Sequence, residues 1–210
     1  MSGNEWQVLQ TIALASLLAW ASGIRLYLVI FALGLAHQFG YFALPDGLKM
    51  LAHPYVVWTA GFLLAIEFLA DKFPGVDSAW DALHTFIRIP AGALLAAGAT
   101  GDTLTALTVA AGLLGGTITA GTHFTKASGR ALINTSPEPV SNWTASLAED
   151  FLVLGGIWLA FQYPIVFLCL LVLFLALVAW LLPKLWRMVK RIWSAFATPR
   201  QIEGSDPSNS

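Results

Sequence analysis

The chain has 210 residues, of which 57% are hydrophobic and only 11% are charged, and its mean hydropathy is +0.71. Soluble globular proteins carry about 25% charged residues, so this composition indicates an integral membrane protein. The net charge of −1 argues against a surface that binds nucleic-acid phosphates, and a single cysteine excludes a disulfide framework.

Six apolar segments follow one another along the chain, and each is about long enough to cross a bilayer. They cover about residues 6–37, 55–70, 77–99, 104–124, 143–161 and 164–182. The first is interrupted by Ser22 and Gly23 with Arg25 just beyond, so we expect it to tilt or break there. Since no segment alternates polar and apolar residues at period two, the predicted class is an all-α polytopic membrane protein with about six transmembrane helices.

The chain beyond the sixth segment differs from the rest. Residues 1–183 form the predicted transmembrane domain, whereas residues 184–200 are basic and separate aromatic from cationic side chains at helical spacing. This pattern predicts an amphipathic helix lying along the inner leaflet. Residues 201–210 are polar and contain Gly and Pro, which predicts a disordered tail.

A short motif occurs twice. Pro54-Tyr55-Val56-Val57-Trp58-Thr59-Ala60 matches Pro139-Val140-Ser141-Asn142-Trp143-Thr144-Ala145 in its Pro, Trp, Thr and Ala. Both copies open an apolar segment. With three spans in each copy, the halves would have opposite orientations, so we predict a 3+3 inverted repeat of residues 6–100 and 103–183.

The orientation follows from the lysines and arginines. With six spans and both termini in the cytoplasm, nearly all of these residues fall on the cytoplasmic side, and Lys49 is the exception. This is the distribution that the positive-inside rule requires. We therefore predict that both termini are cytoplasmic.

Ionisable residues inside apolar segments are the candidate functional residues, because a charge in hydrocarbon is costly and is usually functional. Glu67 lies within the second segment, where Leu63 and Leu69 flank it, and Asp71 follows one helical turn later. The candidate ion pathway consists of Arg25, Glu67, Asp71, His123, Glu149 and Asp150. Carboxylates with an imidazole also suit a divalent metal, and the candidate ligands are Glu67, Asp71, Asp81 and His84.

Three stretches of the sequence carry a family resemblance. They are Ala21-Ser22-Gly23-Ile24-Arg25, Glu67-Phe68-Leu69-Ala70-Asp71-Lys72-Phe73-Pro74 and Arg88-Ile89-Pro90-Ala91-Gly92-Ala93. They resemble the bacterial membrane-protein family catalogued as domain of unknown function 4126, over about residues 10–180. The resemblance implies a location in the bacterial inner membrane and implies no activity.

The leading functional hypothesis is a carrier of a small solute or cation that uses intramembrane acids, with a divalent cation or a proton as coupling ion. The first alternative is a membrane assembly protein without catalytic activity. The less favoured one is an enzyme acting on lipids, in which Asp71, Asp77 and Asp81 would hold Mg²⁺. The expected partner is the lipid bilayer and not nucleic acid. The sequence leaves undecided whether the protein forms a homo-oligomer.

Overall fold

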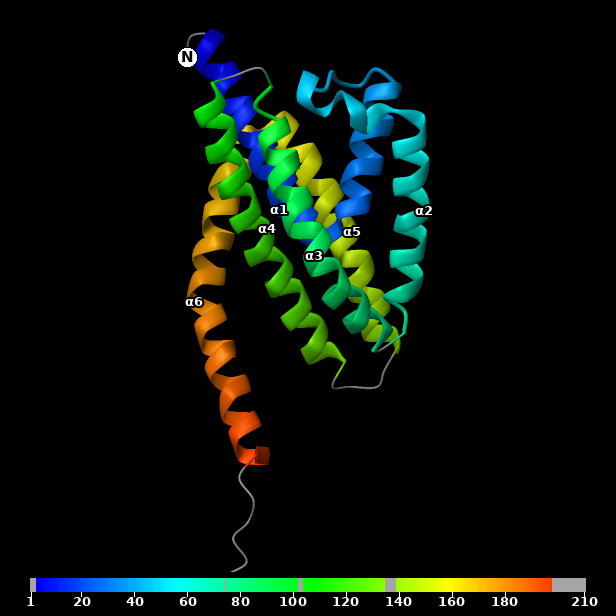
Figure 1. Cartoon of the computed structure of the whole chain (residues 1–210), viewed down its shortest axis with the longest axis vertical. Helices are drawn as coiled ribbons and strands as arrows, with labels where there is room; N and C mark the ends of the chain where they lie inside the picture. The colour runs from blue at the N-terminus through cyan, green and yellow to red at the C-terminus, as the bar shows by residue number, and fades with distance from the viewer. Residues whose placement is uncertain (1–2, 74, 102–103, 135–138, 198–210) are drawn as a thin grey trace, which may run out of the picture.

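The protein is all-helical, as predicted. The structure is a computed structural model that describes the chain apart from residues 1–2, 74, 102–103, 135–138 and 198–210, so the predicted disordered tail lies outside the described residues. The described residues form helices and no strands (Figure 1). The elements are α1 (Gly3–Gln38), the 3-10 helix η1 (Asp46–Ala52), α2 (Pro54–Ala70), α3 (Val76–Gly98), α4 (Thr105–Ile133), α5 (Pro139–Gln162) and α6 (Pro164–Ala197).

The helix boundaries follow local sequence signals. Pro54, Pro139 and Pro164 each open a helix, at the position where the missing N–H of proline is tolerated. Between α2 and α3 the chain turns at Gly75, which has a φ of 89°, a left-handed conformation that glycine adopts without steric cost. These signals explain why most predicted boundaries lie close to the observed ones, whereas α4 and α6 continue beyond their predicted ends to Ile133 and Ala197.

The six predicted spans are not confirmed, because fewer helices qualify by length and composition. In the described part of the chain, four helices are long and apolar enough to cross a membrane, namely α1, α4, α5 and α6. A fifth results if η1 and α2, which meet at 65°, count as one span. Helix α3 is not among them, because Asp77, Asp81 and Arg88 make its first half polar.

The bundle is apolar outside and charged inside. Large hydrophobic side chains such as Trp58, Phe86 and Phe151 are exposed on its surface, whereas Arg25, Glu67 and Arg88 are completely buried. A protein in water would distribute these residues the other way round. This inversion, together with the apolar helices, indicates that the bilayer surrounds the bundle.

Helix α1 breaks at Arg25, where the backbone leaves the helical conformation (φ −142°, ψ 73°). The first half of α1 runs along α4, and the Oγ1 of Thr119 in α4 donates a hydrogen bond to the carbonyl oxygen of Ala19 at 2.8 Å. Beyond the break α1 runs back in the opposite direction. Arg25, at the break, pairs with Glu67 near the end of α2, whereas Gly34, further along α1, packs against Val57 near the start of α2.

Both ends of α1 therefore lie at the same end of the bundle (Figure 1). Gln7 and Thr11 from the first turns of α1 line one cavity of about 580 Å³ together with Leu44 and Pro45, which follow the helix. The first turn of α1 and the last turns of α6 lie at opposite ends of the bundle (Figure 1). The predicted break is thus observed, but its consequence is a reversal of the chain and not a tilt.

This reversal bears on the predicted repeat and orientation. Helix α1 turns back, whereas α4, its expected counterpart, continues unbroken from Thr105 to Ile133, so the 3+3 inverted repeat is not confirmed. The placement of both termini in the cytoplasm is not confirmed either. The local motif does occupy equivalent places, since Trp58 and Trp143 are each four residues beyond the proline that opens their helix.

The order of the helix ends predicts the accessibility of single cysteines in intact membranes. In a Cys169→Ser background, Asn4→Cys and Lys49→Cys should react with a membrane-impermeant thiol reagent from one face, and Arg187→Cys from the other. Permeabilised membranes, in which all three should react, provide the control. Reaction of Asn4→Cys and Arg187→Cys from the same face would contradict a reversal of α1.

Helix α6 continues through Pro183 to Ala197 without a break. It extends beyond the other helices at the lower end of the bundle (Figure 1). A separate amphipathic helix for residues 184–200 is therefore not confirmed. Proline is tolerated inside the helix because neighbouring groups can satisfy the backbone carbonyl that it leaves unpaired.

Helices α1, α3 and α4 meet at Thr119. A Cβ atom on Gly23 of α1 would lie 2.7 Å from the Thr119 carbonyl oxygen, and one on Gly92 of α3 would lie 2.0 Å from its Oγ1. The two glycines allow three helices to approach one another at a single point. This contact lies close to the break in α1 and positions it.

The Gly92→Ala variant should be less stable than the parent by about 1–3 kcal/mol, because the added methyl group overpacks the contact with Thr119. The matched control is Gly155→Ala in α5, where a Cβ atom meets nothing within 4 Å. That substitution should be neutral or slightly stabilising, since alanine favours the helix. Unfolding in detergent measures both, and equal stability of the two variants would contradict the close contact.

Candidate functional site

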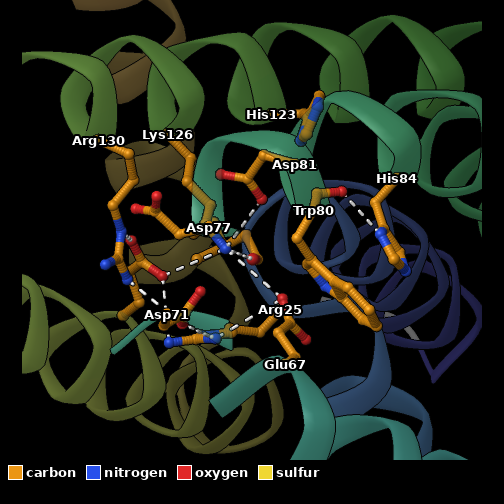
Figure 2. Close-up of polar contacts among 12 residues, drawn as sticks. Arg25, Glu67, Asp71, Asp77, Trp80, Asp81, His84, His123, Lys126 and Arg130 are labelled. Atoms are coloured by element: carbon orange, nitrogen blue, oxygen red, sulfur yellow. Dashed lines mark hydrogen bonds and ion pairs between the residues drawn. The ribbon is translucent and has the colours of Figure 1, made fainter. Parts of the chain in front are cut away.

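A network of ion pairs lies in the interior of the bundle (Figure 2). It joins four cationic side chains with five carboxylates from α1, α3, α4, α5 and the C-terminal end of α2. We call these nine residues the charge network. They are Arg25 of α1, Glu67 of α2, Asp71 directly after α2, Asp81 and Arg88 of α3, Lys126 and Arg130 of α4, and Glu149 and Asp150 of α5.

Arg25 is the centre of this network and is also the residue at which α1 breaks. Its side chain is fully buried and contacts four carboxylates. The nitrogen-to-oxygen distances are 2.5 Å to Asp71, 2.9 Å to Asp150, 3.3 Å to Glu149 and 3.6 Å to Glu67. It also donates a hydrogen bond to the carbonyl oxygen of Ser146 at 3.1 Å. The guanidinium group thereby ties the break in α1 to both α2 and α5.

Glu67 faces the interior, as its apolar sequence neighbours require. Its Oε1 atom receives a hydrogen bond from Arg88 and lies 3.6 Å from Arg25 Nη1 and 3.5 Å from Lys126 Nζ. Three cations thus surround one carboxylate oxygen. Such pairing compensates the cost of placing a carboxylate in an apolar medium.

Lys126 stabilises the break in α1 directly. Its ammonium group donates a hydrogen bond to the carbonyl oxygen of Ile24 at 3.0 Å, immediately before the non-helical residue. The last carbonyls of a helix lack partners within the helix and carry partial negative charge. A lysine at this position therefore caps the first half of α1.

Three cations of the network are not among the six candidate pathway residues. Arg88, Lys126 and Arg130 count with the cytoplasmic lysines and arginines in the predicted orientation, and each also lies in a polar stretch of its segment. All three are buried. A usable signal exists, because His123, Lys126 and Arg130 recur at helical spacing on one face of α4. The same spacing places Asp81 and Arg88 on one face of α3.

The two histidines near the network interact mainly with neutral groups. His123 Nε2 lies 2.7 Å from the Thr85 hydroxyl, and its Nδ1 lies 3.3 Å from Arg88 Nη1. His84 Nδ1 contacts the carbonyl oxygen of Trp80 at 2.8 Å, and its Nε2 contacts the hydroxyl of Tyr27 at 2.9 Å. His84 is thus held by Tyr27 of α1 and by Trp80 of its own helix, and Figure 2 shows the contact with Trp80.

The candidate metal ligands Glu67, Asp71, Asp81 and His84 are otherwise engaged. Each of the three carboxylates pairs with arginine or lysine. In the part of the chain that the structure describes, no group of three or more His, Cys, Asp or Glu side chains is placed to hold a metal ion. The arrangement favours ion pairing of these carboxylates over metal coordination.

The network is sealed on most sides and opens at α5. The side chains of Arg25, Glu67, Asp71, Asp81, Arg88, Lys126 and Arg130 are almost completely buried. In contrast, 16% of the Glu149 side chain and 23% of the Asp150 side chain are exposed. These two residues are the part of the network that reaches the surface of the bundle.

Comparison with known proteins identifies the family and nothing finer. The model of the family described as "Domain of unknown function (DUF4126)" matches residues 12–184, so the chain belongs to this family. No curated protein and no solved structure matches it.

Proposed function

We propose that this member of the DUF4126 family is an ion-coupled carrier of a small solute in the bacterial inner membrane, and that the charge network is its coupling site. The observation that carries the proposal is the meeting of the network with the broken helix α1 at Arg25. Broken membrane helices at charged sites are characteristic of secondary transporters.

The energetics of the site support this function. Charged side chains inside a bilayer are costly and rare, and they mark ion pathways. A structural protein could replace buried ion pairs with apolar residues at little cost or even with a gain in stability. The interior of this bundle instead retains nine ionisable side chains in one connected set, which favours a functional role.

The geometry also offers a means of coupling. At the break in α1, Arg25 holds the end of α2 through Asp71 and α5 through Asp150. A cation that binds to one of these carboxylates weakens its attraction for Arg25 and changes the relative energies of two conformations. We infer that the C-terminal end of α6 is cytoplasmic, because Lys184, Arg187 and Lys190 lie there.

The test uses proteoliposomes that contain a pH-sensitive dye and, in parallel, a sodium-sensitive dye. Pools of sugars, amino acids, nucleosides and organic acids are added outside, and an ion-coupled carrier should move the ion when its solute is present. The Glu67→Gln variant should abolish this movement. The control is Asp46→Asn, which alters an exposed ion pair with Lys49 outside the network. Equal signals from the parent and from protein-free vesicles for every pool would refute the carrier function.

The assembly function stays the alternative. It predicts that network variants that still fold, for example Asp150→Asn, behave as the parent does in every flux assay. A solute-dependent flux that is lost in such a variant therefore separates the two functions.

A further inference from the structure

The charges of the network do not balance. Among the described residues, the connected ion pairs contain the cations Arg25, Arg88, Lys126 and Arg130 and the carboxylates Glu67, Asp71, Asp81, Glu149 and Asp150. Fully ionised, these nine groups carry one net negative charge. A bilayer interior solvates a net charge poorly, which favours a neutral network. The network becomes neutral when it holds one further positive charge.

The carboxylates differ in how many cations surround them. Glu67 and Glu149 each contact three cations. Asp71 and Asp81 each contact two. Asp150 contacts Arg25 at 2.9 Å, and among the described residues no other cation of the network lies within ion-pair distance of it. The excess negative charge is therefore compensated least at Asp150.

The remaining charges around Asp150 act in the same direction. The charged groups that face it are Arg25 of α1, Glu149 on its own helix, and Glu67 and Asp71 from α2 and its end. Three carboxylates thus oppose one guanidinium group. Like charges favour a proton on one of the acids, and Asp150 is also the most exposed acid of the network, with 23% of its side chain accessible.

The positive charge that fits this place is a proton and not a metal ion. A metal cation needs several oxygen ligands, and the oxygens here already face guanidinium and ammonium groups that would repel it. A proton needs one oxygen atom, and its binding neutralises one carboxylate and so ends one ion pair. This comparison identifies the chemical class of the ligand.

We propose that Asp150 is the proton-binding residue of the charge network, with one proton per chain. The inference rests on the proposed function, because it takes the charge network as the coupling site. It adds that the coupling ion is a proton and that the proton binds at Asp150. A proton from water adds to the Asp150 carboxylate and makes it a neutral acid. Arg25 loses one of its four carboxylate partners and keeps Glu67, Asp71 and Glu149, so its hold on α5 weakens at the break in α1.

The test is infrared difference spectroscopy of the protein in nanodiscs during a pH titration. The parent should show the carbonyl absorption of one protonated carboxyl group that disappears as the pH rises. Asp150→Asn should lack this band, Asp150→Glu should retain a band at a different frequency, and the control Asp46→Asn should match the parent. Isotopic labelling of aspartate carboxyl carbons in the parent should shift the band, a result that does not depend on the folding of any variant.

Two results would overturn the proposal. One is a parent without a titrating carboxyl band, and the other is a band that persists in folded Asp150→Asn or does not respond to the aspartate label. The outcome is separable from that of the carrier function. An intact band without solute-dependent proton movement would refute the carrier and leave the proton site, whereas solute-dependent flux without the band would refute the proton site alone.

Discussion

The Arg25→Gln variant should be the least stable single variant of the network, with a loss of about 3–5 kcal/mol or a failure to fold. Removing one partner of a buried ion pair leaves the other partner's charge uncompensated, and losses of this size are typical. Here the loss extends further, because Arg25 contacts four carboxylates and is fully buried. Three cations would then face five carboxylates in the interior.

Denaturant or thermal unfolding in a mild detergent measures this effect. The matched control is Lys49→Gln, which removes a cation from an exposed pair with Asp46 and should change stability little, since exposed pairs contribute little. Arg25→Lys should recover only part of the loss, because a single ammonium group cannot reproduce the fork of donors of a guanidinium group. Stability of Arg25→Gln equal to that of Lys49→Gln would show that the network does not hold the bundle together.

The Glu67→Gln variant should lose about 3–5 kcal/mol for the converse reason. Its carboxylate is fully buried, and its Oε1 atom is shared by Arg25, Arg88 and Lys126. Glutamine keeps the shape of the side chain and removes the charge, so three buried cations lose a common partner. The same unfolding experiment measures the loss.

A double-mutant cycle with Arg88→Gln separates the ion pair from other effects. If Glu67 and Arg88 stabilise each other, the double variant should lose clearly less stability than the sum of the two single variants. A cycle with exactly additive losses would mean that the contact between the two side chains contributes no energy of its own. Asp150→Asn should be milder than either, because Asp150 is partly exposed and contacts one cation.

Much of the fold follows from local sequence signals. Apolar segments of sufficient length, separated by Pro and Gly, predicted the helices that the structure contains, because hydrogen bonding inside a bilayer leaves the backbone few alternatives. Arg25 beside Gly23 predicted the break in α1, since neither residue continues an apolar helix at low cost. The burial of Glu67 followed from its apolar neighbours in the same way.

The partners of the acids were harder to predict. The positive-inside rule predicts that Arg88, Lys126 and Arg130 lie on the cytoplasmic side, because lysines and arginines near the ends of membrane helices are usually found there. The packing of α3 and α4 against α1 directs these three side chains inward instead. Contacts between residues that are distant in the sequence decide this, and a count of charges along the chain does not contain them.

The sequence by itself determined that this protein is a helical membrane protein with ionisable residues in its interior, because the length of each apolar segment and the residues within it can be read directly along the chain. Only the tertiary structure decided that α1 turns back at Arg25, that four cations and five carboxylates form one network, and that this network opens at Asp150. The physical reason is that a charged side chain inside a bilayer is stable only when it is paired with an opposite charge. The packing of the helices decides which opposite charge lies within reach.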